Sequence, residues 1–170
     1  LKLLFITLFL LNFYNYSFSA EIYFIDLKKI INQSKAGKSA QDFLKKKLTN
    51  ETKKFDKEQD ALKKEETDLI AKKKIVSADE YKNNLNELRK KNIDYRKRRQ
   101  TAANAIFKKK EKARIELNKA LKPILEKYMT ENNIDIVMDR KSIVVAKTEI
   151  DLTDKILKLL DKELKSINLK

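Results

Sequence analysis

The chain has 170 residues, and its 40 Lys and Arg residues against 25 Asp and Glu residues give a formal net charge of +15. It contains one glycine, one proline, no cysteine and no histidine. This composition argues against turn-rich sheets and barrels, phosphate-binding loops, zinc sites, disulfides and Ser-His or Cys-His catalytic pairs, because each needs residues that are scarce or missing here. We therefore expect a protein of long helices that is not an enzyme and uses no cofactor.

The N-terminal residues differ in character from the rest of the chain. Lys2 precedes an apolar run over residues 3–11, and the small residues Ser17 and Ser19 fit a signal-peptidase cleavage pattern. The apolar run is shorter than the roughly 20 residues that span a bilayer, which disfavours the alternative of a membrane anchor. The pattern predicts a signal peptide over residues 1–19 that is cut after Ser19, and hence an exported protein.

Charge is distributed unevenly along the remaining chain. Residues 35–122 hold 28 Lys or Arg against 14 Asp or Glu, a net charge of +14, whereas the rest of the mature chain holds 11 of each sign. This asymmetry predicts two regions of different use. We call residues 37–122 the arm, and residues 20–36 together with 123–170 the body.

Apolar runs of β-forming residues at both ends of the chain predict strands in the body. They cover residues 22–26, 134–139 and 142–146. Only Arg140 and Lys141 separate the last two runs, which are therefore expected to form an antiparallel hairpin, although without a preferred turn sequence. Three strands bury little surface by themselves, so self-association is expected.

Two helices complete the predicted body. Residues 27–33 predict a short helix after the first strand, and residues 153–167 carry an apolar stripe at helical spacing behind a Thr153 N-cap. The fold class is α+β: a small β-body of three strands plus helices, with a long antiparallel two-helix hairpin. The expected core of the body, which is also the expected interface between copies, comprises Ile22, Phe24, Ile136, Val137, Val144, Val145, Ile156 and Leu160.

The middle of the chain predicts the two helices of the arm. The first has one apolar residue every seven, and its companion positions are polar, so the seam between the helices is thin. The second follows steps of four and three from Tyr81 to Ile106, with polar interruptions at Asn92 and Arg99. Ser77 and Glu80 form a capping box that starts the second helix and places the tip near residues 75–80. The apolar residues of the first seam are Leu48, Phe55, Leu62, Leu69 and Val76.

The single glycine and the single proline lie near the junctions of arm and body. Gly37 precedes the first long helix, where it is either a hinge or simply a helix boundary. Pro123 removes one helical hydrogen bond near the point at which the second helix rejoins the body, and is expected to kink the helix there.

The basic clusters and aromatic residues of the arm are the candidate functional residues. A basic cluster is either a solvated helix face or part of a field that attracts anionic partners. The aromatic residues either pack the hairpin or contact a bound chain. Export makes nucleic acid an improbable partner, and leaves acidic proteins and anionic lipid. The candidate residues are Lys45, Lys46, Lys63, Lys64, Lys72, Lys73, Arg96, Lys97, Arg98, Arg99, Phe55, Tyr81 and Tyr95.

The order of these parts resembles a known family. A signal peptide is followed by IYFIDLKKIINQS, then by a long basic hairpin, and then by IDIVMDRKSIVVAKTEIDLTDKILKLLDK. This arrangement, over nearly all of the mature chain, is similar to the Skp/OmpH family of periplasmic chaperones. The resemblance implies a homotrimer whose strands build a central body, with three arms around a cavity, located in the periplasm.

The resemblance also implies a function. Family members are ATP-independent holdases that enclose unfolded outer-membrane proteins and prevent their aggregation. Some are proposed to bind lipopolysaccharide, for which residues 96–99 are the expected anionic contact here. Two other functions stay open from the sequence: an exported coiled-coil scaffold, and a basic binder of anionic membrane surfaces.

Overall fold

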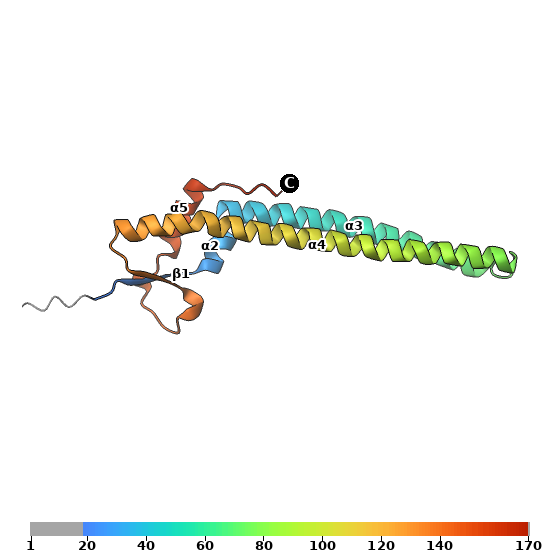
Figure 1. The fold of residues 1–170 in the computed structure, drawn as a ribbon, viewed down its shortest axis with the longest axis horizontal. Helices are drawn as coiled ribbons and strands as arrows, with labels where there is room; N and C mark the ends of the chain where they lie inside the picture. Colours follow the sequence, from blue (N-terminus) through green and yellow to red (C-terminus); the bar gives the residue numbers. More distant parts are fainter. Residues whose placement is uncertain (1–18, 170) are drawn as a thin grey trace, which may run out of the picture.

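The computed structural model describes residues 19–169, so the predicted signal peptide lies, apart from Ser19, outside the described residues. Figure 1 shows a small body at one end of a long two-helix arm. Within the described range, no helix combines the length and apolar character that crossing a membrane requires. The elements are, in chain order, β1 (Ile22–Ile25), α2 (Leu27–Gln33), α3 (Lys35–Lys72), α4 (Ala78–Glu131), β2 (Ile136–Asp139), the 3₁₀ turns η1 (Arg140–Ser142) and η2 (Thr148–Ile150), and α5 (Thr153–Glu163).

The sheet of the body joins the two ends of the chain. β1 pairs in parallel with β2, with Ile22 opposite Ile136 and Ile25 opposite Asp139. On the other side of β1, Leu152 N donates to Phe24 O over 2.9 Å. The two strands that pair are therefore separated by the whole arm, and β1 lies between β2 and the chain that leads into α5.

The prediction of a third strand at residues 142–146 is wrong for the single chain. The Asp139 carboxylate accepts a hydrogen bond from Lys141 N at 3.3 Å and starts η1 directly after β2. This turn leads the chain away from β2, so the expected antiparallel hairpin does not form and β2 pairs with β1 instead. Val144 and Val145, predicted to be core residues, are 100% and 86% exposed in the single chain.

The core of the body is built by helices against β1. Ile30, Ile156 and Leu160 are completely buried in this core, as predicted for Ile156 and Leu160. Phe24 is also buried, at 2% exposure, but outside this cluster, with Arg140 Cζ 5.7 Å from the centroid of its ring. Val137 is half-buried against this core. Ile22 and Ile136, also predicted as core, are 44% and 45% exposed in the single chain.

The prediction that Thr153 is the N-cap of α5 is wrong. It is the first residue of the helix, its hydroxyl accepts a hydrogen bond from Asp26 N at 2.8 Å, and Leu152 precedes it as the N-cap residue. Asp26 in turn caps α2 by accepting from Lys29 N at 2.7 Å. The polar groups at the starts of α2 and α5 thus fix the two helices to each other.

Gly37 lies in the first turn of α3 and is buried. Ser34 ends α2 and caps α3, accepting a hydrogen bond from Gly37 N at 3.1 Å. A Cβ atom on Gly37 would lie 1.8 Å from the Ile31 carbonyl oxygen, closer than any non-bonded contact allows. Glycine is therefore required by the close approach of α2 and α3 at a helix boundary.

The two helices of the arm form an antiparallel hairpin (Figure 1). α3 ends at Lys72, residues 73–77 form the turn, and Ser77 caps α4 by accepting from Glu80 N at 3.2 Å. The cap is as predicted, and the turn lies a few residues earlier than expected. Pro123 lies inside α4, which continues without a break to Glu131 and so carries the arm into the body.

The seam of the arm is thin, as the sequence predicts. Its buried residues are Phe55, Leu62 and Leu69 from α3, and Leu88 and Tyr95 from α4. Leu48, which was predicted to belong to this seam, is instead 54% exposed. Few apolar side chains therefore hold two very long helices together.

Candidate functional site

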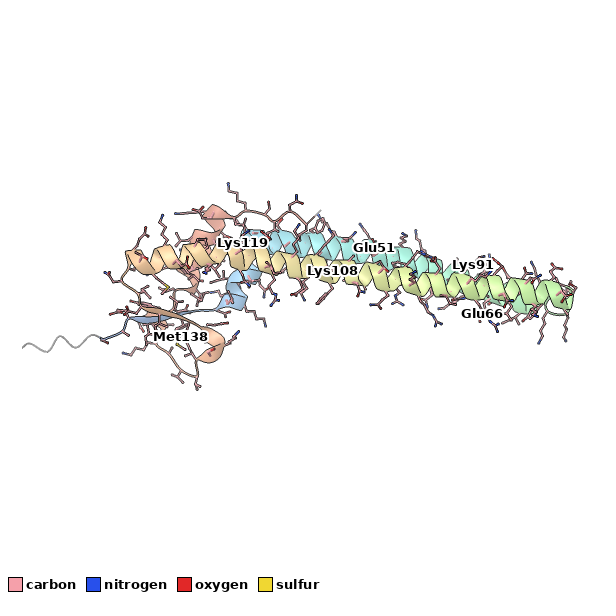
Figure 2. The ribbon with its side chains drawn as sticks, in the orientation of Figure 1. Glu51, Glu66, Lys91, Lys108, Lys119 and Met138 are labelled. Carbon is pink, nitrogen blue, oxygen red and sulfur yellow. The ribbon has the colours of Figure 1, made fainter. Side chains whose placement is uncertain are left out.

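The arm presents a largely uncompensated basic surface. Nine of the ten basic candidate residues are exposed, and Arg98 alone among them is half-buried. Figure 2 shows side chains projecting along the whole length of the arm, with Lys108 and Lys119 on α4 among them. Some cations are paired across the helices, such as Lys91 with Glu65 at 2.5 Å. With a net charge of +14 over residues 35–122, most of the field of the arm remains uncancelled.

Arg98 is used inside the arm. Its Nη1 donates to Glu58 Oε2 across the hairpin at 3.0 Å, and its Nε donates to Asp94 Oδ2 at 2.6 Å. The hydrogen bond from Arg98 lowers the pKa of Glu58, and the hydrogen bonds to Glu58 and Asp94 raise the pKa of Arg98. This group therefore ties α3 to α4, and its charge is partly satisfied before any partner binds.

The aromatic candidates face the seam of the arm. Phe55 and Tyr95 are 6% and 7% exposed, and their rings meet edge to face with centroids 5.8 Å apart. The Tyr95 hydroxyl donates to Gln59 Oε1 at 3.4 Å. Tyr81 is half-buried against the same cluster. Of the two uses left open by the sequence, the structure places Phe55 and Tyr95 in packing.

A second set of apolar residues lies on the outside of the arm. Ile93, Phe107 and Ile115 are 68%, 62% and 58% exposed, and their spacing places them on one face of α4. Basic residues surround them in sequence, for example Lys108 beside Phe107. The sequence could have identified them, because they are apolar residues of the second long helix that do not fall at the positions of the seam repeat. The exposed apolar residues of α3 and the tip are Leu48, Ile70 and Ile75.

The body carries an apolar surface of its own. Ile22, Ile136 and Met138, at 44%, 45% and 38% exposure, lie on the strands, and Val144 and Val145 follow η1. Met138 is labelled on the body in Figure 2. Isolated exposed apolar residues are common on soluble proteins, but a two-stranded sheet that exposes this many is poorly covered by its own chain.

The comparisons with known proteins agree with this architecture. Residues 21–160 match the family model described as outer membrane protein (OmpH-like). The chain belongs to the OmpH-like family. This confirms the resemblance drawn from the sequence, and membership supports a chaperone role.

A solved structure shares the fold. A crystal structure from Caulobacter crescentus CB15, described as that of a candidate outer membrane chaperone (OmpH-like), has a TM-score of 0.80 to this chain at 19% sequence identity. The similarity covers 88% of this chain and 89% of the other. No curated protein matched the chain.

Proposed function

We propose that this OmpH-like protein is an ATP-independent holdase that binds unfolded outer-membrane proteins in the periplasm and prevents their aggregation. The observation that carries this proposal is the outer face of α4, where Ile93, Phe107 and Ile115 are exposed on an arm whose residues 35–122 carry a net charge of +14. Separate apolar contacts bind an unfolded chain without selecting a sequence, and the surrounding charge attracts acidic clients. Neither contact needs a nucleotide.

We propose that the protein acts as a homotrimer built through the body. The outer edge of β2 has no paired strand among the described residues, and Ile136, Met138 and Val144 are exposed beside it. An unpaired edge with apolar neighbours favours association with another strand. Three arms on one body would bind a client at several weak points at once, and the effective concentration would make overall binding tight.

The proposed mechanism follows from the difference between seam and surface. The basic field draws the client to the arms, and the thin seam lets the hairpins bend and splay to admit clients of different sizes. The exposed apolar residues then cover apolar segments of the client. Release follows when the client reaches a lower free energy by inserting into the outer membrane.

The holdase proposal is tested by refolding a denatured outer-membrane β-barrel by dilution, with and without the mature protein. Light scattering should fall as the protein approaches one trimer per client, and the effect should weaken with added salt because screening shortens the reach of the arm charge. No suppression at any salt concentration would refute the holdase and favour a scaffold.

A matched pair of variants tests which surface binds the client. Serine at the three exposed apolar positions of α4, as Ile93→Ser, Phe107→Ser and Ile115→Ser, should weaken suppression without unfolding the arm. The control replaces three exposed polar residues of the same helix, as Asn83→Ser, Asn86→Ser and Asn118→Ser. Equal activity of the two triple variants would argue against this client surface.

The trimer is tested by the mass of the mature chain in light scattering. Val144→Asp should reduce the mass from that of a trimer towards that of one chain, because this side chain is fully exposed in the single chain and lies at the interface that we propose. Ile75→Asp, at the tip of the arm, makes the same kind of change at an exposed position far from the body and should leave the trimer intact. A trimeric Val144→Asp variant would place the interface elsewhere.

A further inference from the structure

The segment that follows α5 lies against the arm. α5 ends at Glu163, and residues 164–169, which we call the tail, form neither helix nor strand. Figure 1 shows the tail leaving the body and running along the base of the arm. The match to the family model ends at residue 160. The tail is therefore outside the part of the chain that the family model describes.

The tail places a leucine between the two helices of the arm. Leu169 is 2% exposed and packs with Ala40 of α3 and Ala113 of α4. The small side chains of Ala40 and Ala113 leave room for Leu169 to pack against both helices. The residues around Leu169, which we call the base groove, are Ala40, Phe43, Leu44, Lys109 and Ala113.

Lys109 completes the base groove with contacts to the main chain and to a ring. Its ammonium donates to the Leu169 carbonyl oxygen and lies 5.8 Å from the centroid of the Phe43 ring. A carbonyl oxygen is present in every residue, and a leucine side chain is common in apolar segments. The contacts that the base groove makes with Leu169 are therefore available to many extended apolar segments of polypeptide.

The tail is held by side-chain contacts and not by regular secondary structure. Leu164 and Ile167 pack against the core of the body, and Ile167 also packs beside Leu169 at the base groove, while Lys165 and Ser166 are exposed. A hollow of about 580 Å³ lies between the tail and α4, lined by Lys112, Glu116 and Lys119 on the helix side. A segment without regular structure that spans a hollow between its contacts can detach without unfolding the helices beneath it.

We propose that the base groove is a binding site for an extended polypeptide segment with a leucine-sized apolar side chain, and that the tail is its built-in occupant. A client segment binds there by displacing the tail, so the tail limits access to the base of the arm. This inference rests on the proposed function only for the identity of the competitor, an unfolded client chain.

The test uses the full mature chain and a fluorescent peptide with the sequence of residues 162–170. Leu169→Asp should release the tail, and the peptide should then bind about tenfold more tightly than to the wild type, in which the tail occupies most of the grooves. Ser166→Asp introduces the same side chain at an exposed position of the tail and should bind the peptide as weakly as the wild type. Equal, weak binding to all three proteins would overturn the proposal.

A second variant tests the position of the site. In the Leu169→Asp background, Ala113→Glu fills the base groove with a charged side chain and should abolish peptide binding. Ala103→Glu makes the same change at an exposed position of the same helix and should leave binding unchanged. Loss of binding with both variants, or with neither, would show that the peptide binds elsewhere.

Competition tests whether the groove accepts unrelated chains. The peptide GSGSLGSGS should displace the labelled peptide from Leu169→Asp at millimolar concentration, whereas GSGSSGSGS should not. Displacement only by the sequence of the tail would overturn the proposed ligand class. If the protein binds the peptide but does not suppress client aggregation, the holdase proposal is refuted and the peptide-binding site at the base groove stands. If it suppresses aggregation but does not bind the peptide, only the proposed binding site is refuted.

Discussion

The body and the arm of this protein differ in how much apolar surface each of them buries. In the body, both strands and all four α-helices of the described residues contribute to a core around side chains such as Ile30, Ile156 and Leu160, which are completely buried. In the arm, two much longer helices share a small cluster around Phe55 and Tyr95. The net positive charge, by contrast, is carried by the arm, over residues 35–122. A well-packed body thus carries a loosely packed, strongly charged arm.

The largest expected effect comes from removing a buried leucine in each region. Leu160→Ala should lower the free energy of unfolding by about 3–4 kcal/mol, because a cavity opens in a core that cannot close around it. Leu62→Ala should cost about 1–2 kcal/mol, since the slender hairpin can relax. Urea unfolding followed by circular dichroism, at one protein concentration, measures both. Equal losses would show that the arm is packed as firmly as the body.

Two phenylalanines separate packing from surface within the arm. Phe55→Ala should cost about 2–3 kcal/mol and reduce hydrogen-exchange protection near the Tyr95 contact, because Phe55 is buried in the seam. Phe107→Ala should change stability by less than about 0.5 kcal/mol, because the side chain is mostly exposed. Similar exchange profiles for the two variants would contradict the assignment of Phe55 to the seam.

Gly37 tests the junction of the two regions. Gly37→Ala should destabilise the protein by about 2 kcal/mol, because its Cβ atom would force α2 and α3 apart. Ser39→Ala, an exposed substitution in the same turn of helix, should be nearly neutral. The thermal midpoints of the two variants give the comparison, and a neutral Gly37→Ala would mean that the junction yields easily.

The smallest expected effect is a pH dependence confined to the arm. Arg98 holds the pKa of Glu58 below its ordinary value of 4.5, so the pair stabilises the arm above that pH, and its contribution is lost as the pH falls through the lowered pKa. Hydrogen exchange around residues 58 and 98 should therefore accelerate in acid. Arg98→Gln should have less protection at neutral pH and a weaker acid dependence; an unchanged profile would show that the pair contributes nothing.

The arm was largely predictable from sequence because its determinants are local. A seven-residue apolar repeat, a capping box at Ser77 and Glu80 and an absence of helix breakers specify two helices and a turn. The seam position of Phe55 follows from the same repeat. The exposure of Leu48 does not follow from that repeat. The repeat also gives no sign that Leu169 of the tail packs on the hairpin near the base of the arm.

The body was less predictable because its contacts join distant residues. The runs at 134–139 and 142–146 are adjacent and both rich in β-forming residues, which favours a local hairpin. The parallel partner of β2 lies instead near the N-terminus, and the Asp139 side chain starts a 3₁₀ turn that no strand propensity reveals. The contact between Lys109 and the Leu169 carbonyl oxygen at the base of the arm likewise joins distant residues and leaves no pattern in the sequence.

The parallel pairing of β1 with β2 also constrains the order in which the protein folds. Glu21 N donates a hydrogen bond to Asp135 Oδ2 at 2.9 Å, and these residues are separated by 114 positions along the chain. Closing so long a loop directly is slow, whereas a helical hairpin forms from local contacts and brings its two ends together. Closing the hairpin therefore favours formation of the sheet, and a chain that emerges N-terminus first keeps β1 without its partner strand until residues 136–139 have followed.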